Sequence, residues 1–448
     1  MALVIFFERV NNLNLILGFG STGASVARYL VRKNEPFLIM DSRQEPSGLQ
    51  EISRLNPSEL HLGRFDPSIL SKVSRVIVSP GISYNNPVLK TARHQGKIVQ
   101  TDIEIFLKES KSKVVLVTGT NGKTTVISMA EKLLKTIYGK KKVISLGNIG
   151  KPVLDALEKD YEISLIEISS FHLELSTFIS SSVGVLLNVS QDHLDRHKSL
   201  EEYEKVKKKI LSNTKLALVG DKKYEVYTKG IIKHLNFNTL FDGHEVLFSE
   251  FLSRGWPEHE NANLKASIAI YLALELLNKN IDLTDINCLE KIFESSINIL
   301  KSYKRLPHRY EILGARNGLT FINDSKATNI SSTLRALESA VEFYGPHKVL
   351  LICGGDSKEQ NMAELLNGPV NCLKKVFLFG KDSQLIQEVI YQKVAVEQVS
   401  GLEEAIKKCF DESKKGDVCL LSPACASTDM FTSYKERGNL FKTLVGFD

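Results

Sequence analysis

Residues 114–125 combine residue types that bind phosphate. An apolar, mostly β-branched run leads into Gly119-Thr-Asn-Gly-Lys-Thr-Thr125, and this order predicts a strand, a tight loop and the start of a helix. Glycines allow the loop to turn with positive φ, and the helix start offers its N–H groups to an anion. Lys123 can reach terminal phosphate oxygens, and Thr124 or Thr125 can hold Mg²⁺. The stretch therefore predicts nucleotide binding; the alternative is an ordinary surface turn.

Three further polar residues come at or just after the ends of strand-like apolar runs: Asn148, Glu167 and His193. The carboxyl ends of parallel strands share one rim of a sheet, so these side chains and Lys123 could converge on one ligand. A hard divalent cation prefers oxygen ligands, which favours Glu167. His193 is a less usual Mg²⁺ ligand, so a loop-capping role stays open for it.

A second glycine pattern, Gly18-Phe-Gly20-Ser-Thr-Gly23, lies between a strand-like run and a helical stretch. The next strand-like run ends at Asp41, which matches the GxGxxG fingerprint of open α/β folds. The pattern predicts backbone N–H groups at a diphosphate. The default interpretation is a dinucleotide site with Asp41 on a ribose; the other is that the glycines serve only helix–strand packing.

The last third of the chain also places polar residues after strand-like runs. Asp324-Ser-Lys-Ala-Thr-Asn329 follows one such run, and Asp324 could contact a nucleotide or metal, or cap the next helix. A ligand that carries carboxylates needs cations and hydroxyl donors. The region supplies them at Lys326, Thr328, Lys358, Ser427 and Thr428.

The elements that must position these residues alternate between strands and helices, which predicts an α/β protein. A length of 448 residues predicts about three domains. The net charge of +6 permits phosphorylated ligands but lacks the broad basic signal of nucleic-acid binding. Strand-like surroundings of Cys353 and Cys419 predict buried thiols in a reducing compartment. No signal peptide or membrane insertion is expected, so the sequence predicts a cytoplasmic protein.

Taken in order, the motifs resemble those of the Mur ligase family. The phosphate loop, with Val117 where the general P-loop has glycine, is similar to the family's ATP loop. Residues 188–197, Asn-Val-Ser-Gln-Asp-His-Leu-Asp-Arg-His, resemble the segment whose histidine helps to bind a second Mg²⁺. Leu306-Pro-His-Arg309 resembles the linker whose arginine reaches ATP phosphates. Asp324-Ser-Lys-Ala-Thr-Asn329 is similar to the corresponding segment of the family members that add D-glutamate.

This resemblance implies three domains and a monomer. An N-terminal Rossmann-like domain over 1–105 would bind a UDP precursor, and a central P-loop-type ATPase sheet over 106–306 would bind ATP. A C-terminal Rossmann-like domain over 307–448 would bind the incoming amino acid.

The resemblance also assigns roles to single positions. ATP-binding residues would be Gly119, Thr120, Asn121, Gly122, Lys123, Thr124, Thr125, Asn263, Arg309 and Asp324. The UDP substrate would meet Ser21, Thr22, Asp41, Ser42, Arg43, Gly81 and Asn148. The amino acid would meet Thr328, Lys358, Ser427, Thr428 and Tyr434. Metal ligands would be Thr124, Thr125, Glu167, His193 and Lys207. Two positions depart from the family: Glu260 replaces an asparagine at the adenine side, and Tyr434 replaces a common phenylalanine.

The implied reaction joins UDP-N-acetylmuramoyl-L-alanine and D-glutamate through an acyl phosphate, with ATP and two Mg²⁺ ions, in peptidoglycan precursor synthesis. Lys123, Glu167, His193 and Lys207 would be catalytic. Lys207, four residues after Tyr203, would be N-carbamylated, although the register leaves Lys208 open. The alternatives are an NAD-dependent oxidoreductase, a folate polyglutamate ligase and a non-catalytic nucleotide-binding protein.

Overall fold

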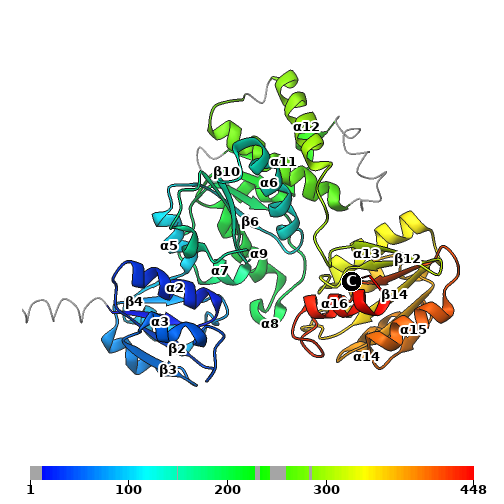
Figure 1. The fold of residues 1–448 in the computed structure, drawn as a ribbon, viewed down its shortest axis with the longest axis horizontal. Helices are drawn as coiled ribbons and strands as arrows, with labels where there is room; N and C mark the ends of the chain where they lie inside the picture. Colours follow the sequence, from blue (N-terminus) through cyan, green and yellow to red (C-terminus); the bar gives the residue numbers. More distant parts are fainter. Residues whose placement is uncertain (1–12, 149, 228–232, 243–258, 282–284, 448) are drawn as a thin grey trace, which may run out of the picture. The chain divides into compact units, whose positions relative to one another are not determined.

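The computed structural model describes residues 13–148, 150–227, 233–242, 259–281 and 285–447 (Figure 1). The chain forms two compact units. The first comprises Met1–Asn188, Glu204–Leu240 and Ala266–Ile299, and the second comprises Val189–Tyr203, Phe241–Lys265 and Leu300–Asp448. The first unit holds two parallel sheets and the second holds one mostly parallel sheet.

The first sheet has five parallel strands in the order β3-β2-β1-β4-β5. Its elements are β1 (Asn14–Leu17), α2 (Ser21–Arg32), β2 (Phe37–Asp41), α3 (Ile52–Leu55), β3 (Glu59–Leu62), β4 (Arg75–Val78), α4 (Pro87–His94) and β5 (Ile98–Gln100), with α5 (Asp102–Glu109) after them. The strand order reverses between β1 and β4, which is where open α/β sheets bind ligands. The Gly18 loop and the turn at Gly81 follow these two strands.

The second sheet has six parallel strands in the order β11-β10-β9-β6-β8-β7. Its strands are β6 (Lys113–Thr118), β7 (Val143–Gly147), β8 (Ile163–Glu167), β9 (Ser181–Leu186), β10 (Thr214–Val219) and β11 (Lys233–Asn236). The helices along this part of the chain are α6 (Lys123–Tyr138), α7 (Ser170–Leu175), α8 (Leu194–His197), α9 (Leu200–Lys208), α11 (His259–Leu277) and α12 (Ile286–Leu300). Val126 of α6 and Ile270 of α11 share one buried cluster with Val117 of β6. Strand β6 lies between β8 and β9, so the ends of these three strands are neighbours.

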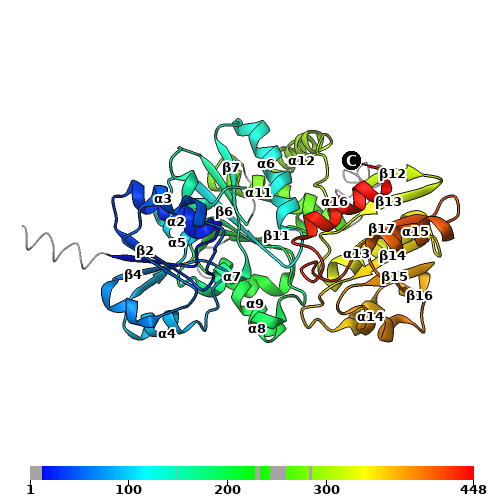
Figure 2. The ribbon, with the colours of Figure 1, turned by 60° about the horizontal axis from the view of Figure 1, so that its bottom comes forward.

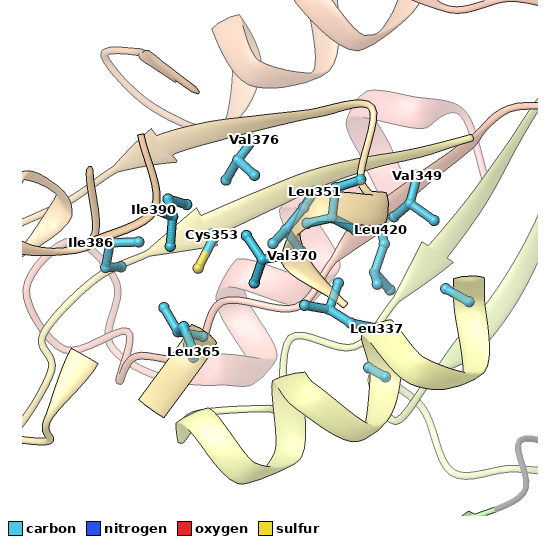
Figure 3. Close-up of a cluster of buried hydrophobic side chains, with 14 of the residues drawn as sticks. Leu337, Val349, Leu351, Cys353, Leu365, Val370, Val376, Ile386, Ile390 and Leu420 are labelled. Atoms are coloured by element: carbon cyan, nitrogen blue, oxygen red, sulfur yellow. The ribbon is translucent and has the colours of Figure 1, made fainter. Parts of the chain in front are cut away.

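The third sheet, in the second unit, has the order β12-β13-β17-β14-β15-β16, and only β12 is antiparallel to its neighbour. Its elements are β12 (Glu311–Arg316), β13 (Leu319–Asn323), α13 (Ile330–Tyr344), β14 (Val349–Gly354), β15 (Lys375–Phe379), α14 (Ser383–Ile390), β16 (Val396–Gln398), α15 (Leu402–Glu412), β17 (Val418–Leu421) and α16 (Tyr434–Val445) (Figure 2). Leu351 and Cys353 pack against α13 and α14 on one face (Figure 3). Leu350 and Ile352 pack against α15 and α16 on the other. Alternate strand residues therefore bury both faces.

The predicted α/β fold class is confirmed, whereas the bounds of the three predicted domains stay predictions. The helix expected near Ser331 begins at Ile330, and the sequence did not indicate the edge strand β12, whose residues are half-buried or exposed. The six cysteines are free, and Cys353 and Cys419 are buried as expected. Within the described ranges, no helix is both long enough and apolar enough to cross a membrane.

Candidate active site

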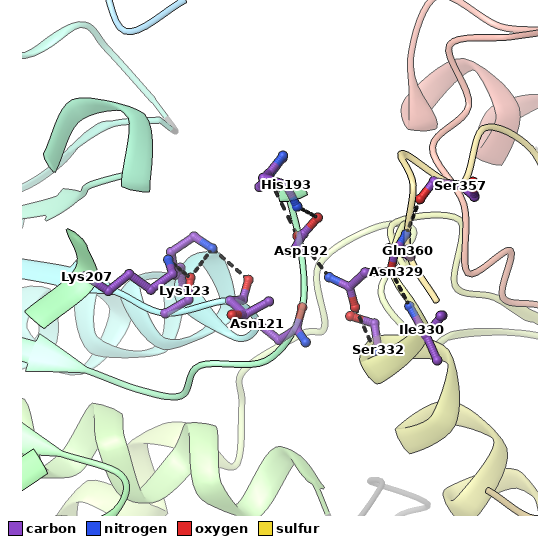
Figure 4. Close-up of polar contacts among 12 residues, drawn as sticks. Asn121, Lys123, Asp192, His193, Lys207, Asn329, Ile330, Ser332, Ser357 and Gln360 are labelled. Atoms are coloured by element: carbon purple, nitrogen blue, oxygen red, sulfur yellow. Dashed lines mark hydrogen bonds and ion pairs between the residues drawn. The ribbon is translucent and has the colours of Figure 1, made fainter. Parts of the chain in front are cut away.

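The phosphate loop connects β6 to α6. Gly122 caps α6 with a φ of +84°, a conformation that favours glycine. A Cβ on Gly119 would lie 2.9 Å from the Cβ of Leu187, so the close approach of the chain after β9 requires a glycine there. Lys123 Nζ donates to the carbonyl oxygens of Gly119 and Thr120 at 2.7 and 2.8 Å (Figure 4). The ammonium group therefore lies at the backbone of the loop that would hold a phosphate.

Asn188 holds this loop in place, and sequence reasoning missed it. The Asn188 carbonyl accepts from the Thr120 N–H at 2.9 Å, and Asn188 Oδ1 accepts from the Asn121 N–H at 2.9 Å. Asn188 Nδ2 donates to the Asn121 carbonyl at 3.2 Å. The available signal was its position, because Asn188 comes just after the buried strand β9, next to the phosphate-loop strand in the sheet.

Glu167 ends β8, next to β6, and its side chain is buried. Thr124 Oγ1 donates to Glu167 Oε2 at 2.8 Å, whereas Thr125 is buried in α6. Mg²⁺ prefers oxygen ligands and binds through one or two protein groups plus phosphate and water. A hydroxyl paired with a carboxylate beside a phosphate loop fits that preference, and Thr124 is the threonine that meets Glu167.

Lys207 reaches the same loop from α9. The residue is only 1% exposed, and its Nζ donates to the Gly119 carbonyl at 2.8 Å. Lys208 Nζ lies 3.5 Å from Glu204 Oε1. The structure therefore brings Lys123, Glu167 and Lys207 together around the phosphate loop, and two ammonium groups share one carbonyl oxygen. Asn148 is exposed at the end of β7, and its N–H donates to the Glu167 carbonyl at 3.1 Å.

His193 and Asn263 belong to the second unit. His193 has a left-handed backbone, with φ +54° and ψ +36°, directly before α8. Its N–H donates to Asp192 Oδ1 at 2.9 Å, and its Nε2 lies 3.7 Å from Asp192 Oδ2. Asn263 is inside α11 and donates through Nδ2 to Glu260 Oε2 at 2.8 Å, so it is not the cap of that helix.

The candidate diphosphate site of the first sheet depends on Asp41. This carboxylate is 2% exposed, and it accepts from the Phe19 N–H at 2.7 Å and from Arg43 Nε and Nη2 at 2.9 and 2.7 Å. Burial would raise the pKa of Asp41, but the hydrogen bonds from Arg43 and Phe19 outweigh it and hold the pKa below its ordinary value. The carboxylate therefore fixes the glycine loop and the exposed Arg43 guanidinium at the end of β2.

The other residues predicted for this site surround Asp41 at the strand ends. Ser21 and Thr22 begin α2 after β1, Ser42 follows β2, and Gly81 lies in the turn after β4. Ser21, Ser42 and Gly81 are exposed. Ser79 Oγ donates to the Gly18 carbonyl at 2.7 Å, which joins the two loops at the point where the strand order reverses.

Asp324 is the central acidic residue of the third sheet. Its Oδ1 accepts from the Tyr310 N–H at 3.0 Å, and its Oδ2 accepts from Ser422 Oγ at 2.9 Å. Burial raises the pKa of Asp324 to about 7, against these hydrogen bonds and the positive charge of Arg309. Asp324 does not cap α13, because Asn329 does so.

The residues predicted to bind the amino acid come from neighbouring segments of the second unit. Thr328 follows β13, Lys358 follows β14, Ser427 and Thr428 follow β17, and Tyr434 begins α16. Lys326 Nζ lies 4.5 Å from the centre of the Tyr434 ring. Ser427 is buried, whereas Thr428 is exposed.

Arg437 connects these segments, and sequence reasoning missed it. Its side chain is fully buried and donates to Ser325 Oγ at 3.0 Å, to the Ser325 carbonyl at 2.9 Å and to the Cys425 carbonyl at 3.3 Å. Burial lowers the pKa of Arg437 to about 10. Because exposed Lys435 and Glu436 precede it, nothing in the local pattern marks Arg437 as buried.

Three family models match the chain in the order of its sheets. The Mur ligase MurD-like N-terminal domain matches residues 12–101, the Mur ligase middle domain matches 117–271, and the Mur ligase glutamate ligase domain matches 308–425. The chain belongs to the Mur ligase family of ATP-dependent amide-bond ligases, which confirms the family predicted from the motifs.

Relatives from two bacteria carry one name, UDP-N-acetylmuramoylalanine--D-glutamate ligase. The protein of Legionella pneumophila (strain Lens) is 34% identical over 97% of this chain and 99% of its own length. The protein of Coxiella burnetii (strain RSA 331 / Henzerling II) is 31% identical over 97% of this chain and 98% of its own length. The structure of MurF ligase from Thermotoga maritima in complex with ADP has a TM-score of 0.57 at 19% identity, covering 92% of this chain and 93% of that one, and shares the fold.

Proposed function

We propose that this chain joins D-glutamate to UDP-N-acetylmuramoyl-L-alanine in an ATP-dependent reaction of peptidoglycan precursor synthesis. The observation that carries the proposal is the 34% identity, over 97% of the chain, to the Legionella protein of that name. A carboxylate is a poor acylating agent, so it first attacks the γ-phosphorus of ATP, giving an acyl phosphate and ADP. The amine of D-glutamate then attacks the acyl carbon, and phosphate and a proton leave as the amide forms.

The phosphoryl-transfer step needs positive charge where negative charge develops. In this proposal Lys123 and the N–H groups of the phosphate loop bind the ATP phosphates, with Arg309 contributing a planar guanidinium. The predicted residues of the first sheet bind the UDP part, and Asn148 contacts the sugar peptide. Thr328, Lys358, Ser427, Thr428 and Tyr434 bind D-glutamate.

Two Mg²⁺ ions, when bound, neutralise phosphate charge. Thr124 is proposed to hold one, with Thr125 as the alternative, and Glu167, His193 and a carbamylated Lys207 to hold the other. The contacts of Lys207 support its modification, because Lys123 Nζ and Lys207 Nζ lie 2.7 and 2.8 Å from the same Gly119 oxygen. Two ammonium groups so placed repel each other. Carbamylation replaces one of them with an anionic oxygen donor, as a Mg²⁺ site needs.

The proposal also places the reaction in the cytoplasm, with the protein acting as a monomer. All six cysteines are free thiols, which is the usual state in a reducing compartment.

The test is release of inorganic phosphate from ATP and Mg²⁺ in the presence of UDP-N-acetylmuramoyl-L-alanine. We expect release only when D-glutamate is also present, and little with L-glutamate or with either enantiomer of aspartate. Lys123→Ala is the matched inactive control. Release with L-glutamate at the same rate would contradict the assigned amino acid, and no release from folded protein that binds ATP would contradict the ligase assignment.

A further inference from the structure

The turn that carries His193 is stabilised by a buried carboxylate. Asp192 is 7% exposed. Its Oδ1 accepts from the His193 N–H at 2.9 Å, and its Oδ2 accepts from Asn329 Nδ2 at 3.1 Å (Figure 4). A left-handed backbone costs free energy for a residue other than glycine, so the φ of +54° at His193 persists only if neighbouring contacts fix it. Asp192 supplies such a contact.

Asn329 uses both ends of its amide. Its Oδ1 accepts from the Ser332 N–H at 2.9 Å and so caps α13, while its Nδ2 donates to Asp192. The side chain is 3% exposed. An amide offers an acceptor and a donor on one short stem, which neither a carboxylate nor a hydroxyl reproduces in this geometry.

The same helix start is connected to the loops proposed to bind D-glutamate. The Ile330 N–H donates to Gln360 Oε1 at 3.0 Å (Figure 4). Gln360 Nε2 donates to the Ser357 carbonyl at 2.8 Å and to the Ala424 carbonyl at 3.4 Å. Ser357 precedes Lys358, and Ala424 lies in the segment that leads to Ser427. The start of α13 therefore contacts the His193 turn on one side and both amino-acid-binding loops on the other.

We propose that Asn329 is a positioning residue that fixes the Asp192–His193 turn relative to the loops of Lys358 and Ser427. The roles of His193, Lys358 and Ser427 in this proposal rest on the proposed function. Its physical content is that one buried amide couples the placement of a proposed metal ligand to that of the amino-acid site. Removing the Nδ2 donor should loosen the turn and affect both Mg²⁺ and D-glutamate.

The chain offers a substitution that separates this donor from the helix cap. Asn329→Asp keeps an excellent capping oxygen, but it places a second carboxylate against Asp192. In the double variant Asn329→Asp/Asp192→Asn, the donor and acceptor are exchanged and the charge of the pair is unchanged. Asn361→Asp is the matched control, because Asn361 is an exposed cap whose oxygen accepts from the Ala363 N–H at 3.2 Å. Asn329→Ser keeps a cap without adding charge and replaces Asn329→Asp if that variant does not fold.

The first readout is amide hydrogen exchange over residues 189–199 in the ligand-free chain. We expect exchange to be about tenfold faster in Asn329→Asp, as loss of one buried hydrogen bond predicts. It should return toward the wild-type rate in the double variant and stay unchanged in Asn361→Asp. Because this measurement uses no substrate, it holds even if the proposed reaction is wrong. Unchanged exchange in Asn329→Asp, or faster exchange that the double variant leaves in place, would overturn the proposal.

The second readout is the phosphate-release assay, in which the wild-type rate separately tests the proposed function. We expect Asn329→Asp to raise both the Mg²⁺ concentration for half-maximal rate and the KM for D-glutamate by about tenfold. The KM for the UDP precursor should change less than about twofold, because its proposed site lies on the first sheet. Equal rises in all three quantities would indicate general loss of structure and would overturn the specific role of Asn329.

Discussion

Two adjacent lysines of α9 differ in what their ammonium groups contact. Lys207 donates to the phosphate loop at Gly119, whereas Lys208 lies near Glu204. We expect Lys207→Ala to lower kcat by about a hundredfold or more, the scale seen when a group supporting charge in phosphoryl transfer is removed. Lys208→Ala should change kcat less than about twofold, as for a surface ion pair. Steady-state phosphate release from both variants checks this, and a larger loss in Lys208→Ala would reverse the assignment.

Asp102 is a buried carboxyl outside the proposed chemistry. It begins α5, its Oδ1 lies 3.7 Å from His172 Nε2, and that oxygen accepts no hydrogen bond within the described part of the chain. Burial raises the pKa of Asp102 to about 7 in the folded state, from an ordinary value of 3.8. The folded state therefore binds more protons than the unfolded state between these values, so this group makes stability fall as pH rises through that range.

Asp102→Asn should remove this fall, since asparagine resembles the protonated carboxyl. As pH rises from 5 to 8, we expect the free energy of unfolding of the variant to increase relative to that of wild type, by an amount on the order of a few kcal/mol. Urea denaturation at several pH values measures it. Asp66→Asn is the control. Hydrogen bonding to Ser68 lowers the pKa of Asp66, so the pH dependence that Asp66 gives to stability lies below pH 5 and leaves the range from pH 5 to pH 8 unchanged. Parallel pH profiles for wild type and Asp102→Asn would contradict the assignment.

Residue types and their positions after strands were enough to select Lys123 and Glu167 from the sequence. What each side chain contacts could not be predicted in the same way. The fingerprint predicted Asp41 at the end of a strand, where it lies, but only the structure shows its carboxylate accepting hydrogen bonds from Phe19 and Arg43. Arg437 gave no signal, because burial of a guanidinium depends on backbone carbonyls far away in sequence.

At the scale of elements, the contact between the loops after β14 and β17 requires a glycine. Gly355 has a φ of +130°, and a Cβ there would lie 2.2 Å from the Ala426 carbonyl oxygen. Gly345, which ends α13, also has a positive φ, of +92°, but a Cβ there would meet nothing within 4 Å. An alanine would be strained at either position, but only at Gly355 would its Cβ also clash with the backbone.

We expect Gly355→Ala to lower the free energy of unfolding by about 3 kcal/mol or more, because strain and a backbone clash add. Gly345→Ala should cost about 1 kcal/mol, from conformation alone. Denaturation curves of both variants provide the comparison. Equal losses would show that the loops can move apart freely, which would also weaken their role in binding the amino acid.

Strands with mostly apolar sequences, such as β6, β8 and β14, were predictable because parallel strands are buried on both faces. Strand β12 was not, because an edge strand with exposed residues has no such run. The pairing order of the strands also lies beyond local pattern. It decides that Glu167 and Asn188 flank the phosphate loop, since β6 lies between β8 and β9.

At the scale of the whole molecule, the motif order predicted three successive domains, and candidate residues follow strands of all three sheets. The division into compact units was not predictable from that order. Residues 189–203, and the described residues of 241–265, group with the third sheet although they lie within the sequence range predicted for the central domain. Such grouping depends on contacts like that of Asp192 with Asn329, between residues distant in sequence.

Binding of nucleotide is expected to restrict the two units relative to each other. Lys123 belongs to the first unit and Arg309 to the second, and the proposed reaction uses both on the phosphates of one ATP molecule. Closure would also exclude water from a hydrolysable acyl phosphate. We therefore expect the radius of gyration from small-angle scattering to fall when a non-hydrolysable ATP analogue, Mg²⁺ and the UDP precursor are added together. In Arg309→Ala, the radius of gyration should fall less, although the variant should still bind the UDP precursor. An unchanged radius in wild type, with binding of all ligands confirmed by calorimetry, would exclude closure as the step that protects the intermediate.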